Sequence, residues 1–161
     1  TLAVNVSPLQ FRDPGFISTI AETLKDSGAP ARHLKLEITE TLFLGDIANT
    51  IERLTILKQE MGIGLSLDDF GTGYSSLNYL KRLPIDQVKI DRSFVSDVHL
   101  NPSDSAIAAA VIALGHTFGL EVVAEGVETT EQRDALVALG YERFQGYLYG
   151  RPVPISEFPV A

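Results

Sequence analysis

Cysteine and long apolar runs are both absent from this sequence. The 161 residues contain no cysteine, which excludes disulfides and thiolate metal sites and fits a reducing compartment. No apolar run approaches the roughly 20 residues that cross a membrane, and no N-terminal stretch reads as a signal peptide. Positive charge is scarce too, because the formal net charge is −8. That balance argues against a nucleic-acid polymer or an anionic membrane surface as the partner.

The excess of acid has two interpretations. Most acidic proteins simply carry a solvated negative surface. An acidic protein that handles a phosphate group, however, must take positive charge from elsewhere, and a divalent cation is the usual source. The positions of the acids along the chain decide between these interpretations.

Short apolar runs alternate with amphipathic segments along the chain. Each run is bounded by turn or capping residues, and most are rich in branched residues, which is typical of β-strands. We predict strands at 2–6, 34–38, 63–67, 87–90, 121–124 and 143–148. Strands that alternate with helices pair in parallel, in an open doubly wound sheet or a (β/α)8 barrel. The glycine-rich dinucleotide fingerprint is absent after the first strand, but periodicity alone does not separate the two architectures.

Capping residues mark the expected helix ends. We predict that Asp13 and Pro14 start the first helix and that Gly28 ends it. The next helix is expected between Asp46 and Gly62. The later predictions are a short helix that opens at Ser75 and ends before Pro84, a buried helix over 106–114, and a helix from a Thr129–Gln132 capping box to Gly140.

Polar residues recur at the carboxyl end of strand after strand. In a barrel these ends converge on one mouth, which is the catalytic face. A single carboxylate there could merely cap the next helix, but capping does not explain the repeated pattern. The residues concerned are Asn5, Glu37, Glu40, Asp68, Asp69, Lys89, Asp91, Glu125, Glu128 and Gln145.

Oxygen ligands of this kind suit Mg²⁺ or Mn²⁺. The consecutive carboxylates Asp68 and Asp69 could bridge two ions, which is a known solution for phosphodiester hydrolysis. Lys89 is a cation within this acidic mouth. It either stabilises a phosphate oxygen or positions the attacking water, or it forms a structural salt bridge with a neighbouring acid.

Other local motifs point less clearly to function. The run 69–73, Asp-Phe-Gly-Thr-Gly, is not a protein-kinase metal motif because no His-Arg-Asp loop precedes it; it fits a glycine-rich turn or a loop that moves over the site. We expect structural or surface roles for His33, His99 and His116. The aromatic residues Phe144, Tyr147 and Tyr149 favour packing over a platform for stacking bases.

Taken together, the motifs resemble one family, the EAL phosphodiesterases. They run in family order: Asn-Val-Ser at 5–7, Glu-Ile-Thr-Glu at 37–40, Asp-Asp-Phe-Gly-Thr-Gly at 68–73, Lys-Ile-Asp at 89–91, Glu-Gly-Val-Glu at 125–128, Gln-Gly-Tyr at 145–147 and Gly-Arg-Pro at 150–152. The resemblance implies a (β/α)8 barrel that hydrolyses cyclic di-GMP to the linear dinucleotide pGpG with two Mg²⁺ or Mn²⁺ ions. It implies that Asn5, Glu37 and Asp68 bind one metal and that Asp68, Asp69 and Glu125 bind the other.

The resemblance also implies roles in the chemistry. Glu125 matches the general base and Lys89 the residue that holds the attacking water. Glu40 matches an anchor for the loop after Asp69, and Gln145 a contact to water or substrate. Asp91 and Glu128 match positions that contact the metal ligands without binding the metal themselves.

One part of the family pattern is missing. The Glu-Ala-Leu signature, whose glutamate is a metal ligand, and the arginine after it lie in the family on a strand before the one that carries Asn5. We therefore expect residues 1–161 to form an incomplete barrel of about six β/α units, inactive by itself. The alternative function is an inactive EAL domain that acts as a receptor for cyclic di-GMP. The resemblance further implies a cytoplasmic homodimer, fused to sensory or GGDEF-type domains.

Overall fold

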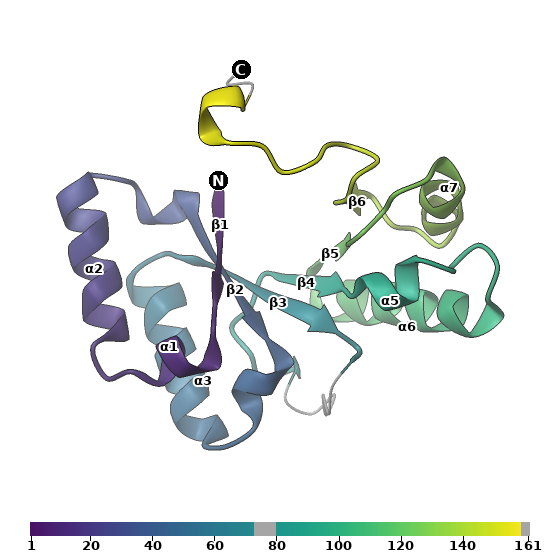
Figure 1. The fold of residues 1–161 in the computed structure, drawn as a ribbon. Helices are drawn as coiled ribbons and strands as arrows, with labels where there is room; N and C mark the ends of the chain where they lie inside the picture. Colours follow the sequence, from purple (N-terminus) through teal and green to yellow (C-terminus); the bar gives the residue numbers. More distant parts are fainter. Residues whose placement is uncertain (73–79, 159–161) are drawn as a thin grey trace.

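The computed structural model describes residues 1–72 and 80–158, and within them strands alternate with helices (Figure 1). The strands are β1 (Leu2–Val6), β2 (Leu34–Thr39), β3 (Gly64–Phe70), β4 (Gln87–Ile90), β5 (Glu121–Ala124) and β6 (Arg143–Phe144). The α-helices are α1 (Pro8–Arg12), α2 (Phe16–Ser27), α3 (Ile47–Thr55), α5 (Arg92–Val95), α6 (Pro102–Phe118) and α7 (Thr130–Ala138). Shorter turns of helix are η1 (Ala31–His33), η2 (Glu40–Phe43), η3 (Ile56–Glu60) and η4 (Ile155–Glu157).

The strands form one parallel sheet in the order β1-β2-β3-β4-β5-β6. This sheet is curled. Lys35 of β2 and Glu121 of β5 form an ion pair of 3.5 Å, although three strand spacings, about 14 Å in a flat sheet, separate their strands. The sequential strand order and the curl confirm the predicted incomplete (β/α)8 barrel and exclude the alternative, an open doubly wound sheet.

Alternation along the strands sorts side chains between the two faces. On β2 and β3 the buried apolar residues are Leu36, Ile38, Leu65 and Leu67. They belong to a core that includes residues of the surrounding helices, among them Phe11, Leu54, Val95, Ala108 and Leu136. The residues between them face the inside of the curl, which is polar. The interior therefore carries the charged residues at the strand ends, while the apolar core lies beneath the helices.

Several predicted helix boundaries are confirmed. Asp46 accepts a hydrogen bond from the Asn49 backbone N–H (3.1 Å), and Thr129 and Gln132 form the expected capping box. Gly28 has a positive φ at the end of α2. The buried helix is longer than predicted, extending over 102–118. The helix expected at Ser75 lies outside the described residues.

β3 extends over 64–70 rather than 63–67, and two further boundaries were predicted wrongly. Asp13 does not cap a helix that starts at Pro14: Ser7 caps α1 one turn earlier, and α2 begins at Phe16. The Asp13 carboxylate instead accepts from the Gly15 backbone N–H (2.7 Å) in the turn between the two helices. The last strand also ends at residue 144 rather than 148, because the chain turns back on itself after Gly146, whose carbonyl accepts from the Tyr149 N–H (3.0 Å).

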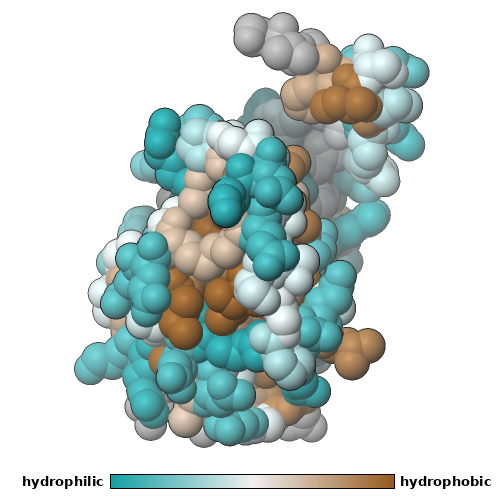
Figure 2. All heavy atoms as spheres, turned by 90° about the vertical axis from the view of Figure 1, so that its left-hand side faces the viewer, coloured by the Kyte–Doolittle hydropathy of each residue, from teal (hydrophilic) through white to brown (hydrophobic). Residues whose placement is uncertain are grey.

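The side of the sheet that carries β1 is open. Leu2 and Val4 are 67% and 40% exposed, and within the described residues β1 pairs only with β2. An apolar groove of about 580 Å³ lies between β1, α2 and the start of β2, lined in part by Val4, Phe16 and Ile20. Figure 2 shows apolar surface in the middle of this face. No helix in the described part of the chain is both long and apolar enough to cross a membrane.

Candidate metal centre and active site

Four neighbouring strands, β2 to β5, bring charged side chains to one end of the curled sheet. Lys89 of β4 lies in the middle and is only 3% exposed. Its Nζ is 3.0 Å from Glu37 Oε1, 3.3 Å from Asp68 Oδ1 and 2.5 Å from Glu125 Oε1. The predicted salt bridge of Lys89 is thus a contact with three carboxylates, all of them residues that the sequence analysis selected.

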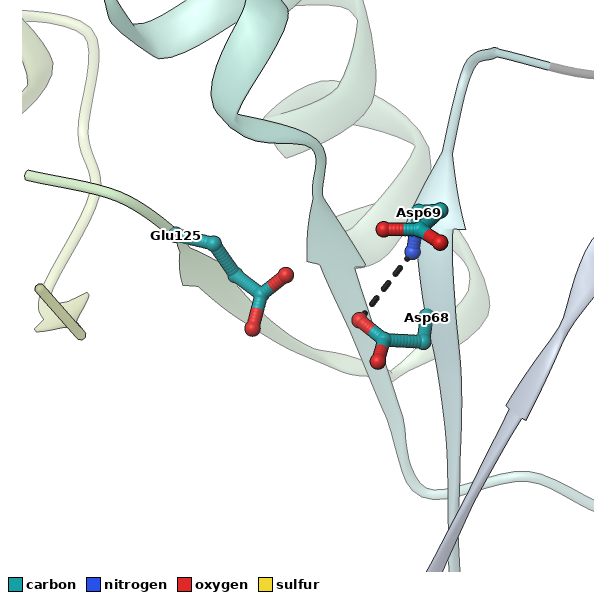
Figure 3. A group of neighbouring side chains, drawn as sticks. All are labelled: Asp68, Asp69 and Glu125. Atoms are coloured by element: carbon teal, nitrogen blue, oxygen red, sulfur yellow. Dashed lines mark hydrogen bonds between the residues drawn. The ribbon is translucent and has the colours of Figure 1, made fainter. Parts of the chain in front are cut away.

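Asp68, Asp69 and Glu125 form a group that could hold a cation, since one ligand oxygen from each lies within 4.8 Å of the others. In Figure 3 the Glu125 carboxylate extends from the end of β5 toward Asp68 on β3. The donor set is all oxygen, which fits a hard divalent ion. These are the same three residues that the family resemblance assigns to one metal.

Consecutive strand residues normally point to opposite faces, yet Asp68 and Asp69 share this site. The register of β3 against β4 shifts between Leu67 and Phe70, and Asp69 is the one non-glycine residue with positive φ (54°) in the described chain. The Asp69 backbone N–H then donates to Asp68 Oδ1 (3.1 Å; Figure 3). A bulge of this kind re-aims side chains at functional sites, and here it turns both carboxylates toward Glu125.

Burial and mutual repulsion set the ionisation of this group. Burial raises the pKa of Glu125 to about 7; Lys89 opposes the rise and Asp68 adds to it. Burial, followed by the negative charges of Asp68 and Asp91, also raises the pKa of Asp69. Burial alone would lower the pKa of Lys89, but its hydrogen bonds to Glu125 and Glu37 and the charge of Asp68 outweigh that effect and raise it. The cluster carries more negative than positive charge, so a cation is favoured there.

Glu40 lies beside the end of β3. It is 7% exposed, and its Oε1 accepts from the Gly71 backbone N–H (3.1 Å). The other carboxylate oxygen is buried and has no hydrogen-bond partner in the described part of the chain. This contact joins η2 to the loop after Asp69, at the place where the resemblance puts an anchor. The second glycine of that loop, Gly73, lies outside the described residues.

The remaining predicted site residues lie around this cluster. Asn5 is exposed and stands opposite Glu37 in the register of β1 and β2. Gln145 is exposed just beyond β6, not within the strand, where its backbone N–H still donates to Ala124 O (2.8 Å). Asp91 caps α5 through the Ser93 backbone N–H (2.9 Å).

Glu128 lies outside the carboxylate group and pairs with Arg92 Nη2 (2.9 Å). Arg92 was not selected from the sequence, although its place directly after the Lys-Ile-Asp motif is a signal that could have found it. Histidines 33, 99 and 116 are all exposed. Phe144 packs against the core, whereas Tyr147 and Tyr149 are 49% and 54% exposed.

The profile of one protein family, described as the EAL domain, matches residues 1–152. The chain belongs to the EAL domain family. It is 46% identical, over 97% of its length and 23% of the relative's, to the bifunctional diguanylate cyclase/cyclic di-GMP phosphodiesterase MucR of Pseudomonas aeruginosa. The solved MucR phosphodiesterase in complex with c-di-GMP superposes with a TM-score of 0.91 at 45% identity, covering 96% of this chain and 62% of that one.

A second solved relative contains a metal. BlrP1 of Klebsiella pneumoniae, in a manganese and cyclic di-GMP complex, has a TM-score of 0.86 at 35% identity, covering 94% of this chain and 39% of that one. This EAL domain spans about a fifth of the length of the first curated relatives that it matches.

Proposed function

We propose that this EAL domain catalyses the hydrolysis of cyclic di-GMP to pGpG, with Mg²⁺ or Mn²⁺ as the cofactor. The observation that carries the proposal is the group of Asp68, Asp69 and Glu125 beside the buried cation Lys89. Relatives named as cyclic di-GMP phosphodiesterases, at 41–46% identity, support the choice of substrate.

In the proposed reaction, water adds to one phosphorus of the substrate, the P–O3′ bond breaks, and the leaving oxygen takes a proton. Divalent ions bound here would lower the pKa of water and neutralise phosphate charge. Glu125 would accept the proton of the attacking water, the role that the family resemblance implies for it; its carboxylate lies beside Asp68 and Lys89 at the end of β5. Lys89 holds the Glu125 carboxylate at 2.5 Å and supplies a fixed positive charge near the phosphate.

The proposed ligand sets use two strand ends for one ion and three for the other. Asp68, Asp69 and Glu125 would hold one ion; their oxygens already converge. Asn5, Glu37 and Asp68 would hold the other. Asn5 and Glu37 are register partners on adjacent strands, and Glu37 and Asp68 both approach the Lys89 ammonium. Gln145 would contact water or substrate from the rim.

We further propose that the domain continues into additional β/α units that pair with β1. The support is physical: Leu2 and Val4 are exposed on an edge strand, next to an apolar groove, and such an edge is normally paired or covered. The solved MucR chain is also longer than this one, which covers 62% of it. Fusion to GGDEF-type or sensory domains, a homodimer and a cytoplasmic location complete the proposal.

The test is turnover of cyclic di-GMP by the purified full-length protein, with product measured by chromatography. We expect pGpG with Mg²⁺ or Mn²⁺ and none with EDTA, and we expect Ca²⁺ to bind without supporting turnover. Glu125→Gln should lower kcat by orders of magnitude, whereas His116→Gln, an exposed residue on α6, should match the wild type. Tight binding of cyclic di-GMP without turnover in either metal would favour the receptor function instead.

A further inference from the structure

The single turn α5 contacts the chain just after two of the proposed metal ligands, Asp69 near the end of β3 and Glu125 after β5. It follows β4 directly (Figure 1). On one side its first residue, Arg92, contacts the loop after β5 at Gly126. On the other side Phe94 contacts the loop after β3 at Gly71. The three heavy atoms nearest to an added Cβ all belong to Phe94 at Gly71 and to Arg92 at Gly126.

The contact with Gly126 is the tighter of the two. A Cβ atom added to Gly126 would lie 2.4 Å from Arg92 Cγ and 2.8 Å from its Cβ and Cδ. The backbone of the residue that follows Glu125 thus rests on the aliphatic part of the arginine, with no room for any other side chain. Gly126 also has φ of +67°, a left-handed conformation that favours glycine. Arg92 therefore limits where the backbone of Glu125 can lie.

The contact with Gly71 is similar in kind. Its Cβ atom would lie 3.0 Å from Phe94 Cε2, and its φ is +99°. Gly71 follows Asp69 by two residues, and its backbone N–H also donates to Glu40 Oε1 (3.1 Å). The Phe94 ring and the Glu40 carboxylate thus both contact the chain just after Asp69.

We infer that Arg92 and Phe94 are positioning residues that set the separation of Asp69 and Glu125, and thereby the fit of the site to its metal. The inference rests on the proposed function. One rigid turn touches both loops, so a change in either side chain moves one carboxylate relative to the other. Ligand geometry is demanding for small divalent ions, and groups that support metal ligands typically matter about 10–100-fold for metal affinity or activity.

The aliphatic stem of Arg92, not its charge, is the part that acts. The Arg92 and Glu128 side chains are 60% and 36% exposed, and ion pairs in such surroundings contribute little. The stem, by contrast, lies in direct contact with Gly126. This distinction can be tested, because methionine keeps the stem as far as its third heavy atom while losing the ion pair.

The experiment measures Mn²⁺ binding to the metal-free, full-length protein by calorimetry, together with kcat/KM and the melting temperature. We expect Arg92→Ala and Phe94→Leu to weaken Mn²⁺ binding about tenfold, and Arg92→Met to change it less than about twofold. Matched controls, expected to bind Mn²⁺ as the wild type does, are Arg133→Ala, which removes a surface pair with Asp134, and Phe118→Leu, a half-buried core contact.

A double-mutant cycle separates positioning from general damage. If Arg92 acts through Glu125, then Arg92→Ala should have little further effect on Mn²⁺ binding in a Glu125→Gln background. Three results would overturn the inference: lower melting temperatures with unchanged Mn²⁺ affinity, equal losses for Arg92→Ala and Arg92→Met, or full additivity in the cycle. A wild type that neither binds Mn²⁺ nor turns over substrate would remove the proposed function as well.

Discussion

Replacing Lys89 with methionine should destabilise the metal-free protein strongly, and the loss should depend on pH. Lys89 is 3% exposed and contacts carboxylates that are themselves 11%, 12% and 17% exposed. Removing one partner of a buried ion pair costs about 3–5 kcal/mol. With three carboxylates left unneutralised, we expect a loss of about 4 kcal/mol in the free energy of unfolding at pH 8.

The loss should shrink as the pH falls. The pKa of Glu125 is already raised to about 7, and removal of the neighbouring cation raises it further. Protonation of one carboxyl relieves the repulsion by up to about 1.4 kcal/mol for each pH unit below its pKa. Glu125 of the wild type also becomes protonated between pH 8 and pH 6, so the Lys89→Met variant should regain up to about 1.4 kcal/mol relative to the wild type.

The assay is urea unfolding in EDTA at pH 6 and pH 8, followed by circular dichroism. The matched control is Lys58→Met. Lys58 pairs with Asp86, but both side chains are about a third exposed, at 34% and 38%, so its loss should cost at most about 1 kcal/mol. Equal losses for the two lysine variants at pH 8, or a Lys89→Met deficit that is the same at both pH values, would refute the reasoning.

Three further outcomes follow from single contacts. Folding raises the pKa of Glu125 from 4.5 to about 7, so between pH 4.5 and pH 7 the folded protein binds more protons at this residue than the unfolded chain does. This contribution to stability is complete below pH 4.5 and is lost as the pH rises through about 7. The wild type in EDTA should therefore lose unfolding free energy relative to Glu125→Gln over that window. Tyr141→Phe, which removes the buried hydrogen bond to Ala108 O (2.9 Å), should cost about 1 kcal/mol in urea unfolding. Gly115→Ala, whose Cβ would lie 2.0 Å from Val122 Cγ2, should cost about 1–3 kcal/mol.

Each of these has its own check. A constant difference between wild type and Glu125→Gln from pH 4.5 to pH 8 would contradict the assignment of the raised pKa. Tyr141→Phe with wild-type stability would mean that the hydroxyl contributes nothing. The Gly115→Ala loss should be partly recovered in combination with Val122→Ala; a greater-than-additive loss in the double variant would contradict steric conflict as its cause.

The order and type of the strands and of the longer helices were predictable because their signals are local. Apolar runs of strand length, the Thr129–Gln132 capping box and the glycine at the end of α2 each depend on a few neighbouring residues. Parallel strands place all their carboxyl ends at one edge. That rule is enough to predict from the sequence alone that Glu37, Asp68, Lys89 and Glu125 are neighbours.

What only the tertiary structure decided depends on contacts between distant segments. The bulge in β3 turns Asp69 to the side of Asp68, and no strand period predicts it. The three partners of Lys89 come from three strands. The contact of Gly126 with Arg92 joins the loop after β5 to α5, although the two residues are 34 positions apart in sequence. Residue types and their spacing determine which groups can reach the mouth of the barrel, but the packing of one loop on another determines how far apart their atoms lie.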